Sequence, residues 1–196
     1  MNRWIEPVTL EGQHVKLVPL SLEHEAALEA AAADGELWKL WYTSVPAPGA
    51  TRAWIDAALA MRDNLGAHPF TVIDAKTGDV VGSTRYFNVE AAHRRLEIGH
   101  TWYAKRVQRT ALNSEAKLLL LSHAFEKLSA IAVEFRTHFM NHQSRAAIAR
   151  LGARQDGILR NHQIGKDGAY RDTVVFSIIE SEWPAVRIHL KHRLES

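Results

Sequence analysis

One segment of the chain limits the possible folds more than any other. A strand-like run at 96–103 is followed by a polar, basic stretch, then by a strongly apolar helical pattern within 113–128 and by a second alternating run at 131–139. A strand, a helix and another strand in this order form a crossover, and a crossover joins two parallel neighbours of one sheet. We therefore expect one parallel pair of strands at the centre of this fold.

The other patterns place antiparallel strands around this unit. Two alternating runs at 69–75 and 80–88 are joined by Lys76-Thr77-Gly78-Asp79, in which the glycine supplies the positive φ of a tight hairpin turn. The remaining strands are expected at 13–20, near 154–160 and at 173–179, and the last two flank a Lys166-Asp167-Gly168 turn. The remaining helices are expected at 21–33, 51–65, 143–151 and from about Ser181. The order β-α-α-β-β-β-α-β-α-β-β predicts an α/β (α+β) fold, and no linker or repeat divides residues 1–196, so a single domain is expected.

Composition excludes several classes of site. The 196 residues contain no cysteine, which removes disulfides, thiolate metal sites and cysteine nucleophiles. The 11 histidines include the close pairs His138/His142 and His189/His192, but neither pair has a plausible third ligand nearby, so no metal is expected. A net charge of +2 does not require a nucleic-acid partner.

The sequence also bears on location. The first residues, MNRWIEPVTLEG, lack the apolar core of a signal peptide, and no apolar run approaches the length of a membrane span. We expect a cytoplasmic protein without a membrane partner, and both a monomer and a homodimer remain open.

The stretch between 103 and 113 has the chemistry of an anion site. A loop that opens a helix presents unpaired backbone N–H groups and the positive end of the helix dipole, and Lys105, Arg106 and Arg109 stand beside that end. A phosphate or pyrophosphate would fit there. A solvated basic loop, with the helix capped by Asn113 or Ser114, explains the same residues equally well.

Two motifs carry a resemblance to a known family. The first motif is a loop of the form Gln/Arg-x-x-Gly-x-Gly/Ala, which is similar to Gln108-Arg109-Thr110-Ala111-Leu112-Asn113, although Ala111 and Asn113 replace its small residues. The second motif has the form Asn-x-x-Ser…Leu-Gly, which is similar to the stretch from Asn141-His142-Gln143-Ser144 to Leu151-Gly152. On these residues the chain resembles the GCN5-related N-acetyltransferase (GNAT) superfamily, in the branch typified by RimJ and RimL, which acetylate N-terminal amines of ribosomal proteins. The resemblance covers about residues 9–187.

The resemblance implies a fold and a reaction. It implies a mixed, mostly antiparallel sheet whose fourth and fifth strands, 96–103 and 131–139, splay apart to admit the pantetheine of acetyl-CoA. The acetyl group would pass directly to a primary amine, on a protein N terminus or a small molecule, in a ternary complex without a metal. Backbone N–H groups of the fourth strand would polarise the thioester carbonyl. The residues implied to bind acetyl-CoA are His100, Thr101, Trp102, Gln108, Arg109, Thr110, Ala111, Leu112, Asn113 and Asn141.

Proton transfer needs two further groups. Many superfamily members have a tyrosine acid seven residues after the asparagine, but Ile148 stands there, and the branch's serine, Ser144, is the candidate for assisting thiolate departure. Ser144 could equally be an ordinary first-turn helix residue. Glu97 is the candidate base for the amine, provided that it does not point to solvent, and His100 and His138 follow it. The residues considered as walls of the acceptor site, or alternatively as core, are Trp38, Trp41, Tyr42, Arg85, Tyr86 and Phe87.

Two other functions remain open at this point. The departures at Ala111 and Asn113 are compatible with a catalytically weak or inactive member of the fold that binds CoA or a partner. A nucleic-acid module using Lys105, Arg106 and Arg109 is the other alternative, which the small net charge disfavours.

Overall fold

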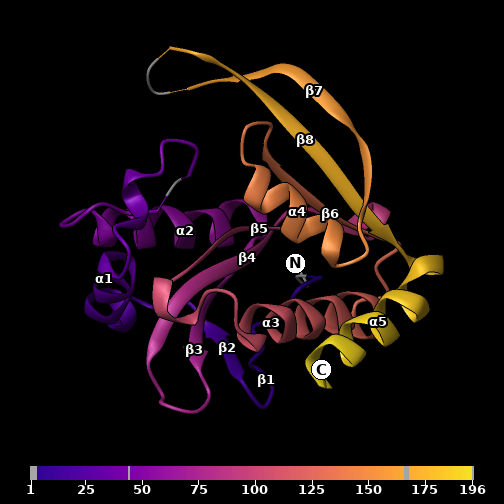
Figure 1. Ribbon diagram of the computed structural model, residues 1–196, viewed down its shortest axis with the longest axis horizontal. Coiled ribbons are helices and arrows are strands. Elements are labelled where there is room, and N and C mark those ends of the chain that lie inside the picture. Colours follow the sequence, from indigo (N-terminus) through magenta and orange to yellow (C-terminus); the bar gives the residue numbers. More distant parts are fainter. Residues whose placement is uncertain (1–3, 44, 166–167, 196) are drawn as a thin grey trace.

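A mixed sheet forms the centre of the molecule (Figure 1). The computed structural model describes residues 4–43, 45–165 and 168–195. In spatial order the strands in these ranges are β1 (Leu10–Glu11), β2 (Val15–Pro19), β3 (His68–Asp74), β4 (Val80–Glu90), β5 (Arg95–Tyr103), β6 (Ala132–His138), β8 (Tyr170–Ile179) and β7 (Arg154–Ile164). All neighbours are antiparallel except β5 and β6, which are parallel, so the expected mixed, mostly antiparallel sheet is confirmed.

Helices cover both faces of this sheet. They are α1 (Glu25–Ala33), α2 (Thr51–Leu65), α3 (Ala111–Ser122), α4 (His142–Arg150) and α5 (Trp183–Glu195). The connections β5-α3-β6 and β6-α4-β7 advance in the same direction across the sheet, and right-handed crossovers therefore place α3 and α4 on the same face. Figure 1 shows α3, α4 and α5 on this near side.

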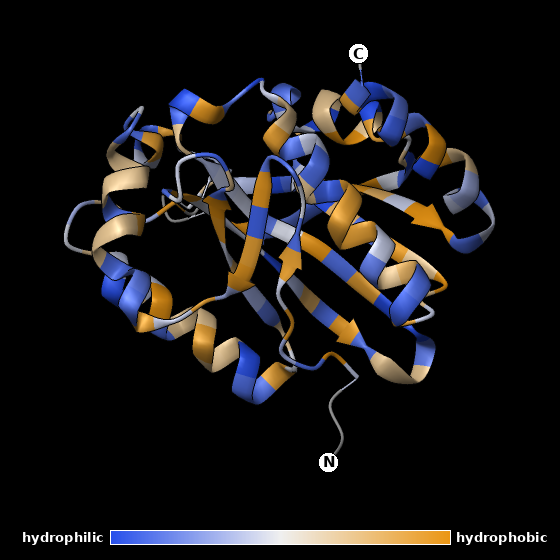
Figure 2. Cartoon of the chain, turned by 90° about the horizontal axis from the view of Figure 1, so that it is seen from below, coloured by the Kyte–Doolittle hydropathy of each residue, from blue (hydrophilic) through white to orange (hydrophobic). Residues whose placement is uncertain are grey.

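The alternation of side chains along β4 shows which helix covers which face. The hydroxyl of Tyr86 donates to the backbone carbonyl of Leu120 in α3, whereas the guanidinium of the preceding Arg85 lies over the ring of Trp54 in α2. Successive residues of a strand point to opposite faces, so α2 lies on the face opposite α3. In Figure 2 the strands between these two helix layers carry much of the hydrophobic colour.

The parallel pair separates after a short contact. β5 and β6 pair only at Arg95↔Ala132, Leu96↔Val133 and Glu97↔Glu134, after which each strand continues without the other. Beyond this point β5 contains a bulge: the register with β4 passes from Arg85↔Gly99 to Ser83↔Trp102, and His100 has a φ of +49°. A bulge bends its strand, which explains the divergence. The expected splay is thus present between β5 and β6.

Some expected boundaries were wrong. The helix expected from Asn113 begins at Ala111, and Thr110, not Asn113 or Ser114, is its N-cap, because the extended Thr110 accepts a hydrogen bond from the Leu112 N–H at 3.3 Å. The strands β7 and β8 are longer than expected and form an arm that projects past β6 (Figure 1). Of the turn expected at its tip, Lys166 and Asp167 lie outside the described residues. The short β1 had not been expected.

Candidate active site

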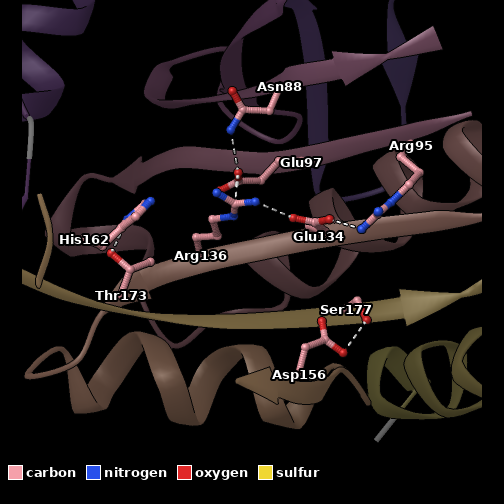
Figure 3. Close-up of polar contacts among 9 residues, drawn as sticks. All are labelled: Asn88, Arg95, Glu97, Glu134, Arg136, Asp156, His162, Thr173 and Ser177. Carbon is pink, nitrogen blue, oxygen red and sulfur yellow. Dashed lines mark hydrogen bonds and ion pairs between the residues drawn. The ribbon is translucent and has the colours of Figure 1, made fainter. Parts of the chain in front are cut away.

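Glu97 lies at the vertex of the splay. It is the last residue of β5 that pairs with β6, and only 2% of it is exposed. Its Oε2 accepts a hydrogen bond from Asn88 Nδ2 at 2.9 Å and lies 3.4 Å from Arg136 Nε (Figure 3). Burial raises the pKa of Glu97 to about 7, against the opposing effects of Asn88 and Arg136. A carboxylate with a pKa near neutrality is well suited to accept a proton at physiological pH.

A chain of alternating charges holds the position of Arg136. Its Nη2 donates to Glu134 Oε2 at 2.9 Å, and the other oxygen of Glu134 is in contact with Arg95 (Figure 3). Because Glu134 and Arg136 are two residues apart on β6, they point to the same face. The guanidinium that contacts Glu97 is therefore fixed from the neighbouring strand.

The bulge in β5 contains His100, which packs against Phe87 of β4. The imidazole lies edge-on to the ring of Phe87, with centroids 4.8 Å apart. Burial, and then the charges of Arg85 and Arg171, lower the pKa of His100 to about 4, so the ring is neutral near pH 7. A bulge takes one residue out of the regular ladder, so this stretch can present a backbone N–H to the gap between β5 and β6.

Thr101 and Trp102 lie on opposite faces just beyond the bulge. The hydroxyl of Thr101 accepts a hydrogen bond from Lys117 Nζ at 2.9 Å and lies 2.8 Å from the hydroxyl of Thr84. Trp102 contacts Trp54 of α2, with ring centroids 6.0 Å apart. Lys117 is 6% exposed, and burial lowers its pKa to about 7. The sequence reading had missed this buried lysine, although it interrupts the apolar face of its helix.

The loop before α3 contains three basic side chains, of which Lys105 and Arg109 have no acidic partner in the described part of the chain. Arg106 is turned toward Asp34, with Nη1 3.0 Å from Oδ2, and toward Asp79. Arg109, by contrast, is exposed and has a φ of +62°, which places it at the apex of the loop just before the N-cap.

The other loop residues have mainly local contacts. Gln108 donates from Nε2 to the Tyr103 carbonyl at 2.9 Å, and Leu112 is buried in the core. Ala111 opens the helix with an ordinary negative φ. The Oδ1 atom of Asn113 is buried and has no hydrogen-bond partner among the described residues.

Asn141 and Ser144 open α4 at the far end of β6. Asn141 is the N-cap, and its Oδ1 accepts a hydrogen bond from the Ser144 N–H at 2.9 Å. This contact has a structural purpose, but the structure shows no hydrogen bond from Asn141 Nδ2 or from the Ser144 hydroxyl to a described residue. Ile148 is buried, so no polar group replaces the tyrosine acid there.

Aromatic side chains lie near the opening on the α2 side. Trp41 is 67% exposed and packs edge-on against His138, with centroids 4.8 Å apart, and against Tyr42. Trp38 is partly buried against the core. Tyr86 does not belong to this wall: it is fully buried and faces α3, because its position on β4 has the opposite alternation to Arg85 and Phe87.

The sequence reading had also missed Asn88, Arg136 and Arg171. Arg136 could have been found, because Glu134, Arg136 and His138 are the polar half of an otherwise apolar alternation. Among residues 4–43, 45–165 and 168–195 there is no cluster of side chains suited to a metal ion. No helix in those ranges is long and apolar enough to cross a membrane.

Comparisons with known proteins agree with this geometry. The family model described as "Acetyltransferase (GNAT) domain" matches residues 14–154. A Bacillus subtilis protein named "Putative ribosomal N-acetyltransferase YdaF" is 29% identical over 106 residues, which are 54% of this chain and only 57% of that protein. The crystal structure of a GCN5-related N-acetyltransferase from Brucella melitensis is 32% identical, with a TM-score of 0.86 over 97% of this chain and 86% of the other. Mycobacterium smegmatis RimJ, solved in complex with CoA-disulfide, shares the fold, with a TM-score of 0.78 at 23% identity over 95% of each chain.

Proposed function

The chain belongs to the acetyltransferase (GNAT) family, and from this premise we propose that it acetylates a primary amine, on a protein N terminus or a small molecule, with acetyl-CoA as donor. The observation that carries the proposal is Glu97. A buried carboxylate with a pKa of about 7 stands where the two central strands separate, which is the position from which an amine between them can be deprotonated.

The residues around the splay fit the donor. Arg109 offers to the phosphates an exposed guanidinium that has no ion pair among the described residues, and the N-terminus of α3 offers backbone N–H groups. Beyond Glu97, the edge of β5 that faces β6 has no strand partner, so its backbone groups are available to the amides of a pantetheine arm. Asn141 Nδ2 can donate to the same arm, and the buried Asn113 Oδ1 can accept from the ligand.

Acetyl-CoA supplies the acetyl group as a thioester. Glu97 accepts a proton from the acceptor ammonium, which leaves a lone pair on nitrogen for attack on the carbonyl carbon. Backbone N–H groups near His100, Thr101 and Trp102 donate to the carbonyl oxygen, where negative charge develops. The new N–C bond forms as the C–S bond breaks. The Ser144 hydroxyl gives its proton to the departing sulfur and regains one, through water, from the nitrogen, which thereby becomes the neutral amide. The first test is a screen of primary amines for acceptor-dependent release of free thiol from acetyl-CoA.

Arg109→Glu should weaken CoA binding at least about tenfold, because it replaces attraction by repulsion at the phosphates. Isothermal titration calorimetry measures this directly. Arg193→Glu, an exposed charge reversal on α5, is the control and should bind CoA normally. Unchanged affinity in Arg109→Glu would show that the phosphates lie elsewhere.

Ser144→Ala should reduce kcat by roughly ten- to a hundredfold, with little change in acetyl-CoA affinity, because a hydroxyl is a weak general acid and CoA thiolate is a fair leaving group. The variant keeps the backbone N–H that Asn141 accepts, so the cap of α4 and the fold should be unaffected. Full kcat, under conditions in which chemistry limits the rate, would assign Ser144 to helix initiation and the protonation to water.

The structure weakens the grounds for an inactive, CoA-binding member. Glycine at the first small position of the loop would be needed if the backbone there had a positive φ, but in this chain Arg109 has that conformation and Ala111 does not. The replacement at Ala111 therefore introduces no backbone strain. The nucleic-acid alternative loses Arg106, whose charge is already met by Asp34.

A further inference from the structure

Arg85 is a buried cation without a matching anion among residues 4–43, 45–165 and 168–195. It is 3% exposed, its guanidinium carbon lies 5.3 Å from the centre of the Trp54 ring, and its Nη1 lies 3.3 Å from the sulfur of Met61. Its Nε is buried without a hydrogen-bond partner, and none of the described carboxylates forms an ion pair with it. A thioether and an aromatic face leave most of the hydrogen-bonding capacity of a guanidinium unused, and such a group is costly to bury.

Arg171 on β8 approaches the same region from the other side of the splay. Thr173 is paired with His138, the last residue of β6, and Arg171 lies two residues further along β8, on the same face. It is therefore placed over the part of the splay that β6 no longer fills. Its Nε is also buried without a partner, and within the described residues it has no ion pair.

Positive charge predominates around Glu97. Arg136 and Arg171 act on it from β6 and β8, and Arg85 lies on the same face of β4, opposite Gly99. The nearby Glu134 is already shared between Arg136 and Arg95. Burial, and then the charges of Arg85 and Arg171, lower the pKa of His100, so both guanidiniums act on the imidazole that the bulge of β5 carries. Protonation of Glu97 during the reaction would leave this region still more positive.

We propose that the acceptor is an amine that also carries a carboxylate, and that Arg171 and Arg85 bind this carboxylate while Glu97 receives the amine proton. The proposal rests on the function proposed above and specifies its acceptor class. Arg85 is opposite Gly99, two residues along β5 from Glu97, so the backbone positions from which the two side chains extend are about 7 Å apart along the strand. Groups that far apart suit an amine and a carboxylate within one residue or between neighbouring side chains. The carboxylate can come from a free amino acid or from an acidic side chain beside a peptide N terminus.

The experiment compares matched acceptor pairs by release of free thiol from acetyl-CoA. One pair is L-alanine and L-alaninamide, and the other is two short peptides that begin Ala-Asp and Ala-Asn. L-Alaninamide has a larger fraction of unprotonated amine at neutral pH than L-alanine, so a protein that does not bind the carboxylate would favour the amide. We expect the carboxylate member of at least one pair to have a kcat/KM at least about tenfold higher, and the pair that shows this identifies the source of the carboxylate.

Variants assign this preference to the two arginines. Arg171→Gln should remove most of the tenfold preference, measured as the ratio of kcat/KM for the two members of a pair on the same variant. Arg154→Gln, on the neighbouring strand β7 and 80% exposed, is the matched control and should retain the preference. Arg85→Met, with its fold checked by circular dichroism, should act like Arg171→Gln.

Three results would contradict the proposal. Equal use of both members of both pairs overturns it and leaves the proposed function intact, and so does a preference that survives both Arg171→Gln and Arg85→Met. Failure of every amine to release thiol overturns the proposed function, and the acceptor class with it.

Discussion

Glu97→Gln is expected to lower kcat/KM for acetyl transfer by about 10²- to 10⁴-fold while leaving CoA affinity unchanged. Glutamine has nearly the same shape and can still accept the hydrogen bond from Asn88, but it cannot take a proton from the amine. Glu90→Gln, an exposed change at the end of β4, is the matched control and should keep full activity. A Glu97→Gln enzyme with normal kcat/KM would remove the residue that carries the proposed function.

The pH profile gives this prediction a second readout. Glu97 must be ionised to act, so kcat/KM of the wild type should rise with pH through an inflection near 7, and Glu97→Gln should lack that inflection. The groups that face Glu97 are Asn88, Arg136, Glu134 and Arg171. His100, with a pKa of about 4, does not titrate there. An inflection near 7 that persists in Glu97→Gln would assign it to another group.

The same ionisation has the opposite effect on stability. The folded-state pKa of Glu97 lies above the ordinary value of 4.5, so its stabilising contribution is complete below pH 4.5 and is lost as pH rises through about 7. Glu97→Gln should therefore have a higher Tm than the wild type at pH 8, and this advantage should disappear toward pH 4.5. A variant that is more stable at pH 8 but inactive would show that its lost activity is not a folding defect.

The sequence predicted the fold well where periodicity is strong. The apolar alternation of 131–139 and the helical pattern after 113 define the crossover, and with it the parallel pair. Helix starts were less predictable, because Thr110, Asn113 and Ser114 can all cap a helix and only the left-handed backbone of Arg109 decides between them. The length of the β7–β8 arm was missed because its exposed strands lack an apolar alternation.

Some residues of the candidate site were predictable from the sequence and others were not. Glu97 was a candidate through the family resemblance, because several members of the superfamily have a catalytic glutamate on the fourth strand. Asn88, Arg136 and Arg171 come from three other strands, and they meet Glu97 only through a spatial order, β4-β5-β6-β8, that differs from the chain order. Asn141 was expected to bind the donor, and the structure adds a helix-capping contact that substitution would also remove.

Glu115→Ala is expected to lower the free energy of unfolding by about 3 to 5 kcal/mol, measured by urea denaturation. The carboxylate is 8% exposed and accepts three backbone hydrogen bonds, from Gln13 at 2.9 Å, His14 at 2.6 Å and Val15 at 3.0 Å. Alanine would leave these N–H groups without their acceptor at the start of β2. Glu11→Ala, which removes a largely exposed carboxylate from the adjacent strand, is the control and should cost less than about 1 kcal/mol.

Gly12 provides an internal check on this interpretation. A Cβ at this position would lie 2.4 Å from Cδ of Glu115, so Gly12→Ala should destabilise the wild type strongly but cost much less in the Glu115→Ala background, where the obstructing carboxylate is gone. Additive effects in this double-mutant cycle would show that the two sites are independent and that the three hydrogen bonds of Glu115, here called the clamp, do not hold α3 to β2.

The N-terminus of α3 carries the loop of Arg109 and Thr110. If loss of the clamp releases this helix, Glu115→Ala should also bind CoA more weakly, measured by calorimetry without denaturant. Normal CoA affinity in a destabilised Glu115→Ala variant would confine the role of the clamp to stability.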